Sequence, residues 1–327
     1  MKKIIYIVVV SLEVVSILFI STVIYKRFFS KNKVLGTVSV APISKSDVVI
    51  YDLPELKYYF EYKPNENIEV NVPWLSNKVT YSINKDTLND RYNYSVEKPD
   101  NVFRIVALGD SFTFGQLVNT ADSWPERLED MLNNDSSCNG KKFEVINLGM
   151  PNFGVEYIAY RYKTRGQKYN PDLIVWLESG PGYDRVNELL MPLIDKYRRE
   201  LSEKELQDAL AEGRYVDAEK AYKEMYKTHT KEELLEMVKG SWKTFLALRG
   251  DTMVSIVSFS GLSLDEKEFL TNLTDGLQNV SNYNEVLAGN STKWQLKDGH
   301  PSPDGHKMIA TSISTYLKNS QLIPCSQ

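Results

Sequence analysis

Ser111 is the side chain in this sequence best placed to act as a nucleophile. Phe103 to Leu108 reads FRIVAL, a buried-strand run, and Gly109-Asp110-Ser111 follows it directly. A serine just beyond a hydrophobic strand lies at the edge of a sheet, where backbone N–H groups can stabilise charge that develops on a substrate oxygen. Gly-Asp-Ser is also ordinary turn chemistry, so the position after a strand is what favours a catalytic serine.

A nucleophilic serine needs a base, and the candidates are three histidines: His229, His300 and His306. His229 lies in a charged segment and is interpreted as a surface residue. Asp298 precedes His300 by two residues, a spacing that can place a carboxylate beside the imidazole and stabilise the imidazolium. Alone, the segment DGHPSPDGH at 298–306 reads more readily as a polar turn that caps the last helix. Together with the Ser111 turn, it favours His300 as the base.

The elements that must position these residues are strands separated by helical stretches. Four nearly continuous apolar runs are predicted to be strands: Phe103–Leu108, Phe143–Leu148, Leu173–Leu177 and Met253–Phe259. Trp124 to Leu132 has the apolar spacing of a helix. This pattern predicts a parallel sheet that is covered on both faces, with functional loops at the carboxyl ends of its strands.

Residues 1–33 are predicted to form a membrane anchor and its basic flank. Ile4 to Tyr25 is almost entirely apolar, and as a helix it covers roughly 33 Å, enough for a bilayer core of about 30 Å. A cleaved signal peptide is the alternative, but the run ends in Lys26-Arg27 and not in small residues. More basic residues follow the run than precede it, which favours a cytoplasmic domain. We nevertheless expect a single-pass protein with an extracytoplasmic domain.

Two further segments are distinguished between the anchor and the C-terminus. Residues 34–100 are interpreted as a linker and a β-rich extension, and residues 101–320 as the catalytic domain. A highly charged helical insert is expected at about 189–249, with capping boxes at Ser202-x-x-Glu205 and Thr230-x-x-Glu233. Gly213 and Gly240 are predicted to end helices. Most of these charges form a solvated face; a lid or docking surface is the alternative.

Composition excludes several other classes of function. The net charge is −4, so no basic surface indicates nucleic-acid binding. No CxxC or HExxH spacing occurs, and three histidines make a multi-histidine metal site improbable, so neither a metal nor a cofactor is expected. Cys138 and Cys325 can form one disulfide outside the cytoplasm, or remain two unpaired thiols.

The sequence resembles the SGNH/GDSL hydrolases, in particular their membrane-anchored, extracytoplasmic members. Four segments carry the resemblance, in the family's order: GDSFTFG at 109–115, VINLGMPNFG at 145–154, PDLIVWLESG at 171–180 and DGHPSPDGH at 298–306. The GxSxG elbow of the α/β-hydrolases is absent, because Thr113 stands at its second glycine. The resemblance implies an α/β, flavodoxin-like three-layer sandwich and a triad of Ser111, His300 and Asp298.

The resemblance also implies a set of oxyanion donors, with two departures from the family pattern. Backbone N–H groups of Ser111 and of the second segment are expected to hold the oxyanion. The glycine usual there is replaced by Asn152, and Gly154 follows two residues later. The Gly-x-Asn-Asp usual after the third strand is also missing, so Asn187 or a main-chain N–H near Gly182 is expected to replace its side chain. Asn187 reads slightly better as part of the first exposed turn of the insert.

The expected function is cleavage of an acyl ester through an acyl-enzyme on Ser111. The substrate is expected to carry an ester, and glycan and lipid esters are both open. One alternative transfers the acyl group to a cell-surface polysaccharide instead of water. The altered third segment leaves room for a second alternative, a non-catalytic binding or scaffold protein that keeps the fold.

Overall fold

The computed structural model describes residues 45–138, 140–179, 185–259, 264–281, 284–287 and 294–325. The predicted membrane anchor at 4–25 lies outside these residues. Within the described part of the chain, no helix combines the length and apolarity needed to cross a bilayer. Residues 45 onward belong to one compact unit.

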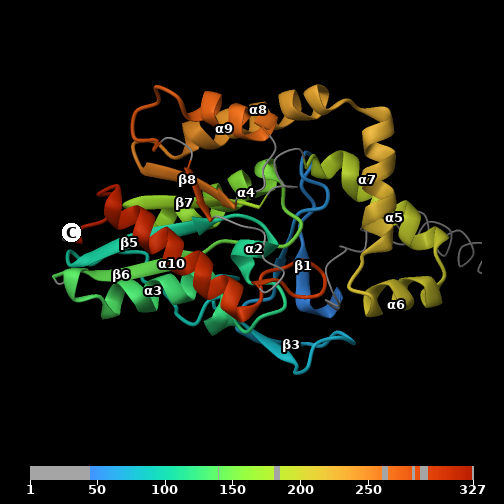
Figure 1. Ribbon diagram of the computed structural model, residues 1–327, viewed down its shortest axis with the longest axis horizontal. Helices are drawn as coiled ribbons and strands as arrows, with labels where there is room; N and C mark the ends of the chain where they lie inside the picture. The colour runs from blue at the N-terminus through green and yellow to red at the C-terminus, as the bar shows by residue number, and fades with distance from the viewer. Residues whose placement is uncertain are drawn as a thin grey trace, which may run out of the picture. The chain divides into compact units, whose positions relative to one another are not determined.

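A five-stranded parallel sheet forms the centre of the fold (Figure 1). Its strands are β5 (Val102–Leu108), β6 (Lys142–Asn147), β7 (Leu173–Glu178), β8 (Met253–Phe259) and β9 (Asn284–Leu287). All neighbouring pairs are parallel. The four strands expected from the sequence are the first four of the sheet. The sequence analysis missed β9, because a four-residue segment with two polar residues lacks the apolar run that marks the others.

The strand order changes direction beside β5. The order across the sheet is β6-β5-β7-β8-β9, so the chain turns to one side after β5 and returns to the other side for β7. In an open sheet of this order, ligands bind where the connections diverge, at the carboxyl ends of the strands. The turn that contains Ser111 follows β5 and Ser179 follows β7, so both border this point.

Alternate residues of β5, β6, β7 and β8 bury their side chains in two separate cores. One core holds Val106, Ile146 and Trp176 and is covered by α4 (Val155–Arg161), α8 (Lys231–Leu248) and α9 (Leu264–Thr274). The other holds Ile105 and Val175 and is covered by α3 (Trp124–Asn134) and α10 (Pro303–Asn319). Figure 1 shows the two helical layers on opposite faces of the sheet, which makes three layers in all.

The β-rich extension is built from two antiparallel strand pairs that pack into the first core. β1 (Val48–Ile50) pairs with β2 (Phe60–Tyr62), and β3 (Glu66–Val70) pairs with β4 (Val79–Ile83). The ring of Tyr62 stacks on Phe114, with centroids 5.1 Å apart. Glu61 is buried against Arg161 at 2.8 Å. Burial alone raises the pKa of Glu61, but Arg161 and Arg165 lower it, to about 2. The extension therefore shares both its apolar core and a buried ion pair with the central fold.

Four helices connect β7 to β8: α5 (Asn187–Glu200), α6 (Glu203–Ala211), α7 (Val216–Thr228) and α8. The capping boxes expected at Ser202 and Thr230 are both present. The expected stop at Gly240 is wrong, because α8 continues to Leu248. Buried Trp242 contacts Trp176 of β7, with ring centroids 4.3 Å apart, and this packing outweighs the low helix propensity of one glycine. Thus α8 is the crossover helix of the sheet, and α5–α7 are the additional part.

The remaining short segments are 3-10 turns at Lys45–Asp47, Thr120–Asp122, Ser136–Cys138 and Gln167–Tyr169, a π turn at Tyr162–Gly166, and α2 (Ser111–Phe114).

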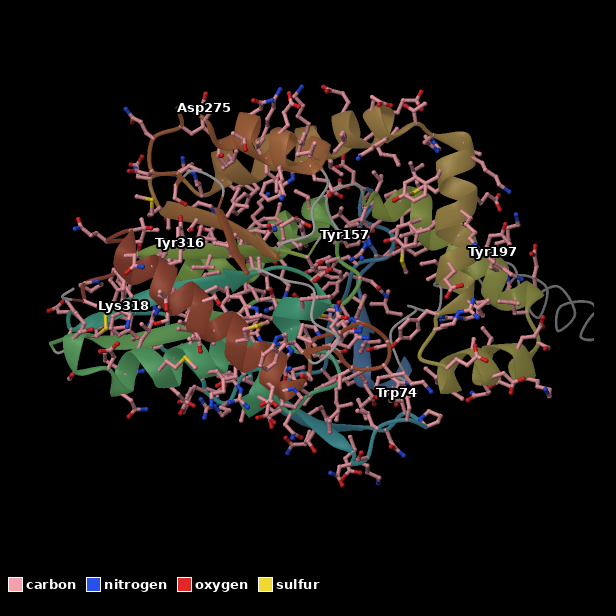
Figure 2. All side chains as sticks on the ribbon, viewed as in Figure 1. Trp74, Tyr157, Tyr197, Asp275, Tyr316 and Lys318 are labelled. Carbon is pink, nitrogen blue, oxygen red and sulfur yellow. A yellow bond between two sulfur atoms is a disulfide. The ribbon has the colours of Figure 1, made fainter. Side chains whose placement is uncertain are left out.

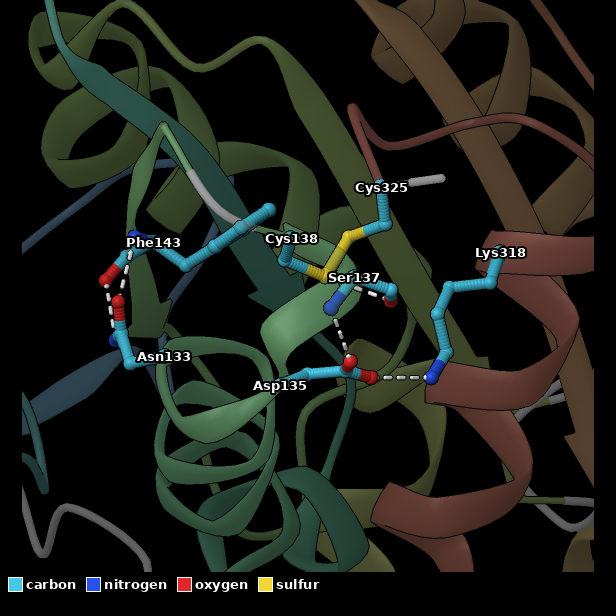
Figure 3. The surroundings of a disulfide bond; sticks show 7 residues. All are labelled: Asn133, Asp135, Ser137, Cys138, Phe143, Lys318 and Cys325. Carbon is cyan, nitrogen blue, oxygen red and sulfur yellow. Dashed lines mark hydrogen bonds and ion pairs between the residues drawn. A yellow bond between two sulfur atoms is a disulfide. The ribbon is translucent and has the colours of Figure 1, made fainter. Parts of the chain in front are cut away.

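A disulfide joins Cys138, just before β6, to Cys325, after α10 (Figure 3). The two residues are 187 positions apart in the sequence. Next to the disulfide, Lys318 donates to Asp135 at 2.6 Å. The sequence left this pairing open, and the structure pairs the two cysteines. The disulfide therefore ties the last helix to the connection between α3 and β6.

Candidate active site

Ser111 begins α2, immediately after the turn that follows β5. Asp110 caps this short helix by accepting a hydrogen bond from the Phe112 N–H at 3.0 Å. A Cβ on Gly109 would lie 2.2 Å from Thr113 Oγ1 and 2.9 Å from the Leu177 carbonyl oxygen, so only glycine fits. The tight turn therefore places Ser111 at the carboxyl edge of the sheet, where 8% of its surface is exposed.

His300 lies between Ser111 and Asp298. Its Nε2 is 2.9 Å from Ser111 Oγ, and its Nδ1 is 2.8 Å from Asp298 Oδ2. The backbone N–H of His300 also donates to Asp298 Oδ1 at 3.1 Å, which closes the Asp-x-His turn. The ring of Phe112 packs beside the imidazole, with centroids 5.4 Å apart. The three polar residues expected from the sequence thus form one hydrogen-bonded chain.

The side chain of Asp298 is buried and is held as a carboxylate by its donors. Burial raises its pKa, but hydrogen bonds from His300 and from the Tyr215 hydroxyl outweigh this effect, so the pKa of Asp298 lies below its ordinary value. The Tyr215 hydroxyl donates to Asp298 Oδ2 at 2.9 Å. Tyr215 lies just before α7, and the sequence analysis did not identify it, because no local spacing relates it to Asp298.

Asn187 holds the loop that faces the nucleophile turn. Its Oδ1 accepts the Gly154 N–H at 2.7 Å, and its Nδ2 donates to the Asn152 carbonyl oxygen at 2.7 Å. It is the first residue of α5, as expected, but it is only 4% exposed, so the expectation of an exposed turn is wrong. The side-chain amide and the Gly154 N–H, both expected as oxyanion donors, are bonded to each other here.

The replacement of glycine by Asn152 has a conformational explanation. Asn152 has φ +65°, in the left-handed region that favours glycine and that asparagine tolerates better than most other residues. The backbone can therefore keep the turn that the glycine would make. The other proposed donor region, around Gly182, belongs to residues 180–184 and lies outside the described part of the chain.

A second polar cluster joins the Ser111 turn to the residues after β7. Asp110 Oδ2 accepts a hydrogen bond from Ser179 Oγ at 2.7 Å and lies 3.5 Å from Arg185 Nη1. Arg185 also donates to the Tyr222 hydroxyl at 3.0 Å. Burial lowers the pKa of Arg185, but Tyr222 and Asp110 raise it by more. The net pKa lies above the ordinary value, so the guanidinium stays charged. The sequence analysis missed Arg185, because its partners lie on distant elements.

The two other histidines have different surroundings. His306 is completely buried, and its Nδ1 accepts the Trp124 N–H at 3.2 Å. Burial lowers the pKa of His306 to about 3, so this ring is neutral. His229 follows α7, with its Nδ1 3.0 Å from Thr228 Oγ1. Among the described residues, no cluster of three or more His, Cys, Asp or Glu side chains could hold a metal ion.

Comparisons with known proteins give matches among solved structures only. No protein-family model matches the sequence. No curated protein sequence matches it either. A protein from Desulfitobacterium hafniense DCB-2 assigned to the lipolytic G-D-S-L family is 16% identical, with 65% of this chain and 98% of that chain covered and a TM-score of 0.34. A family 3 carbohydrate esterase from Clostridium thermocellum is 11% identical, with coverage of 67% and 96% and a TM-score of 0.40. A lipase/acylhydrolase from Enterococcus faecalis is 14% identical, with coverage of 67% and 96% and a TM-score of 0.37.

Proposed function

We propose that this protein is a serine esterase of the SGNH/GDSL type, with Ser111 as nucleophile, His300 as base and Asp298 as the residue that orients the base. The hydrogen-bonded chain from Ser111 Oγ through both ring nitrogens of His300 to Asp298 carries the proposal. A serine hydroxyl is a weak nucleophile unless a base removes its proton as it attacks. His300 lies within hydrogen-bond distance for that role, and buried Asp298 stabilises the imidazolium that results.

The reaction has two steps on the same residues. His300 Nε2 takes the Ser111 proton as Oγ attacks the ester carbonyl, and it returns that proton to the departing alcohol, which leaves an acyl group on Ser111. His300 then takes a proton from water, whose oxygen attacks the acyl carbonyl. When this second intermediate collapses, the proton returns to Ser111 Oγ and the acid departs. Asp298 remains a carboxylate throughout.

The oxyanion of both tetrahedral intermediates needs preorganised donors. We assign this role to the backbone N–H groups of Ser111 and Asn152. Asn187 then has a supporting role, because its amide fixes both Gly154 N–H and the Asn152 carbonyl. One oxyanion donor is worth about 10²–10³ in kcat, so the geometry of this loop matters for the rate.

The test of the triad uses Ser111→Ala, His300→Ala and the double variant. We expect each single change to lower kcat on p-nitrophenyl acetate by at least about 10³-fold, and the double variant to lose little more, because triad members act as a unit. His229→Ala is the matched histidine control and should keep wild-type activity. Turnover at the wild-type level in Ser111→Ala would rule out the mechanism.

The fate of the acyl group needs a separate measurement. A fluorophosphonate should label the wild type and not Ser111→Ala, which separates an enzyme from a non-catalytic protein. Product analysis with and without an added polysaccharide acceptor then separates the two acyl acceptors. Free acid as the product in both reactions supports hydrolysis, whereas an acylated sugar would replace esterase by acyltransferase.

We further propose that residues 4–25 anchor the protein in a membrane and that the catalytic domain is extracytoplasmic. The apolar run of 22 residues supports the anchor. The Cys138–Cys325 disulfide supports the location, because disulfides persist mainly in oxidising compartments.

A further inference from the structure

The additional helices contact the loop that carries Asp298 and His300. Gly213, between α6 and α7, lies against Lys297, and a Cβ on it would lie 2.9 Å from both the Lys297 carbonyl carbon and oxygen. Lys297 Nζ donates to the Ala211 carbonyl at 2.8 Å. Two residues after Gly213, the Tyr215 hydroxyl reaches Asp298. The insert and this loop are therefore joined by a close backbone contact at Gly213, by the Lys297 amine of the loop and by the Tyr215 phenol of the insert.

The α6 end of this contact is itself fixed. Trp74 of the β-rich extension, labelled in Figure 2, donates its indole N–H to the Leu210 carbonyl at 2.9 Å. On the other side, the Gln116 side chain, which follows α2, lowers the pKa of Tyr215 slightly, against the larger effects that raise it. The phenol thus lies between the segment after α2 and Asp298.

The chemistry of Tyr215 suits a permanent donor. Burial, the Asp298 charge and the Asp298 hydrogen bond raise the pKa of Tyr215 above its ordinary value, so the hydroxyl keeps its proton at any working pH. Its acceptor is Asp298 Oδ2, the same oxygen that accepts from His300 Nδ1. The phenol and the imidazole therefore donate to the same carboxylate oxygen, and both stabilise its negative charge.

We propose that Tyr215 is a positioning residue of the Ser111–His300–Asp298 chain, and that the helical insert thereby completes the active site. The proposal rests on the esterase function proposed above. Tyr215 orients Asp298 and withdraws part of its negative charge, which sets how strongly Asp298 stabilises a protonated His300.

The titratable groups around this hydrogen bond lie on several elements. His300 and Lys297 lie on the same loop, Tyr215 comes from the insert, Tyr81 from β4 and His306 from α10. Burial raises the pKa of Tyr81, and His306 is neutral, so neither changes charge near neutral pH. Lys297 directs its amine to Ala211. A change in the pH profile of a Tyr215 variant therefore reports on the Asp298–His300 pair.

The experiment compares Tyr215→Phe with Tyr197→Phe in the full chain. Tyr197 is the matched control, because its hydroxyl also bonds a carboxylate, Glu224, but within the insert on α5 (Figure 2). With the Tyr215 donor removed, Asp298 stabilises the imidazolium more strongly. The acid limb of the plot of kcat/KM against pH should then shift to higher pH, by roughly half a pH unit to one pH unit. Looser positioning of Asp298 should lower kcat roughly three- to tenfold with little change in KM.

A second measurement needs no turnover. The Nδ1–H proton of His300 gives a downfield NMR signal that reports its hydrogen bond to Asp298. This signal should shift in Tyr215→Phe and not in Tyr197→Phe. An inactive wild type that no fluorophosphonate labels would refute the esterase function, while the NMR comparison would still test Tyr215. If Tyr215→Phe keeps the wild-type acid limb, kcat and NMR signal, the positioning role is wrong.

Discussion

At the residue scale, Asn187 shows how one amide can fix a loop through two backbone groups. It lies on α5, accepts the Gly154 N–H and donates to the Asn152 carbonyl oxygen. Under the proposed function, this amide acts on the loop that carries the oxyanion donor and not on the substrate itself. The proposed donor is then a preorganised backbone N–H and not a side chain.

Changing Asn187 to alanine should mainly slow the chemical step. The change leaves the Gly154 N–H without its buried acceptor and releases Asn152 from its left-handed turn. We expect kcat to fall about 10- to 100-fold, with KM nearly unchanged, because loop geometry matters most in the transition state. Steady-state kinetics of the folded variant measure both parameters.

Asn133→Ala is the control for this change. Asn133 makes the same pair of bonds to a backbone, with Phe143, but at the C-terminal end of α3, near the disulfide (Figure 3). It should lose a similar free energy of unfolding, roughly 1–3 kcal/mol, with no loss of kcat. Equal activity of the two variants would show that the Asn187 bonds serve stability alone.

The sequence predicted the residues whose partners are fixed by motif order, and missed those whose partners are not. Ser111, Asp298 and His300 were found together because their types and their positions after strands or in a turn carry the signal. Tyr215 and Arg185 lie just before helices of the insert and bond to distant loops, so no local periodicity indicates them.

At the element scale, the insert divides into two parts with different roles. Most of α8 covers the sheet, whereas α5 and α7 bury a small core of their own together with the first turns of α8: Leu190, Met191, Ile194, Ala221, Met225 and Leu234. The sequence identified the insert as charged and helical. It could not separate these parts, because the distinction lies in which face each helix buries.

Gly213→Ala should disturb the loop of His300 through the α6–α7 junction. Gly213 has φ +77°, and an added Cβ would press on the Lys297 carbonyl. We expect the free energy of unfolding to fall by roughly 1 kcal/mol from the backbone strain, and kcat to fall severalfold because the loop moves. Denaturant unfolding and steady-state kinetics give the two values.

Gly250→Ala is the control that separates backbone strain from a steric clash of the added Cβ with a neighbouring residue. Gly250 also has positive φ, +61°, but nothing lies within 4 Å of an added Cβ. The Gly250→Ala variant should show a similar decrease in the free energy of unfolding and keep the wild-type kcat. A Gly213→Ala enzyme as active as Gly250→Ala would show that the junction does not position the loop.

At the scale of the whole molecule, the disulfide and the candidate active site lie at opposite ends of the parallel strands. Cys138 precedes the start of β6, whereas Ser111 follows the end of β5. The nearly continuous apolar runs predicted a sheet covered on both faces. The strand order was not predicted, because periodicity does not specify which strands are neighbours.

The disulfide gives a test of location in the cell. If the domain is extracytoplasmic, a maleimide should label Cys138 and Cys325 only after reduction, and protease added to intact cells should digest the domain. Reduction should lower the free energy of unfolding by roughly 2–5 kcal/mol, because the bridge closes a long loop. Free thiols in freshly lysed cells, together with protease protection before lysis, would place the domain in the cytoplasm.

The distance along the chain between Ser111 and His300 has a consequence for biosynthesis. The two residues are 189 positions apart, and His300 belongs to the last segment of the described fold, shortly before Cys325. During synthesis, Ser111 leaves the ribosome long before a base exists for it. Under the proposed function, a growing chain that has not yet reached His300 cannot attack esters, and the segment that supplies the base also supplies the second cysteine. Activity and covalent closure of the fold should consequently arise together, once this segment has been synthesised.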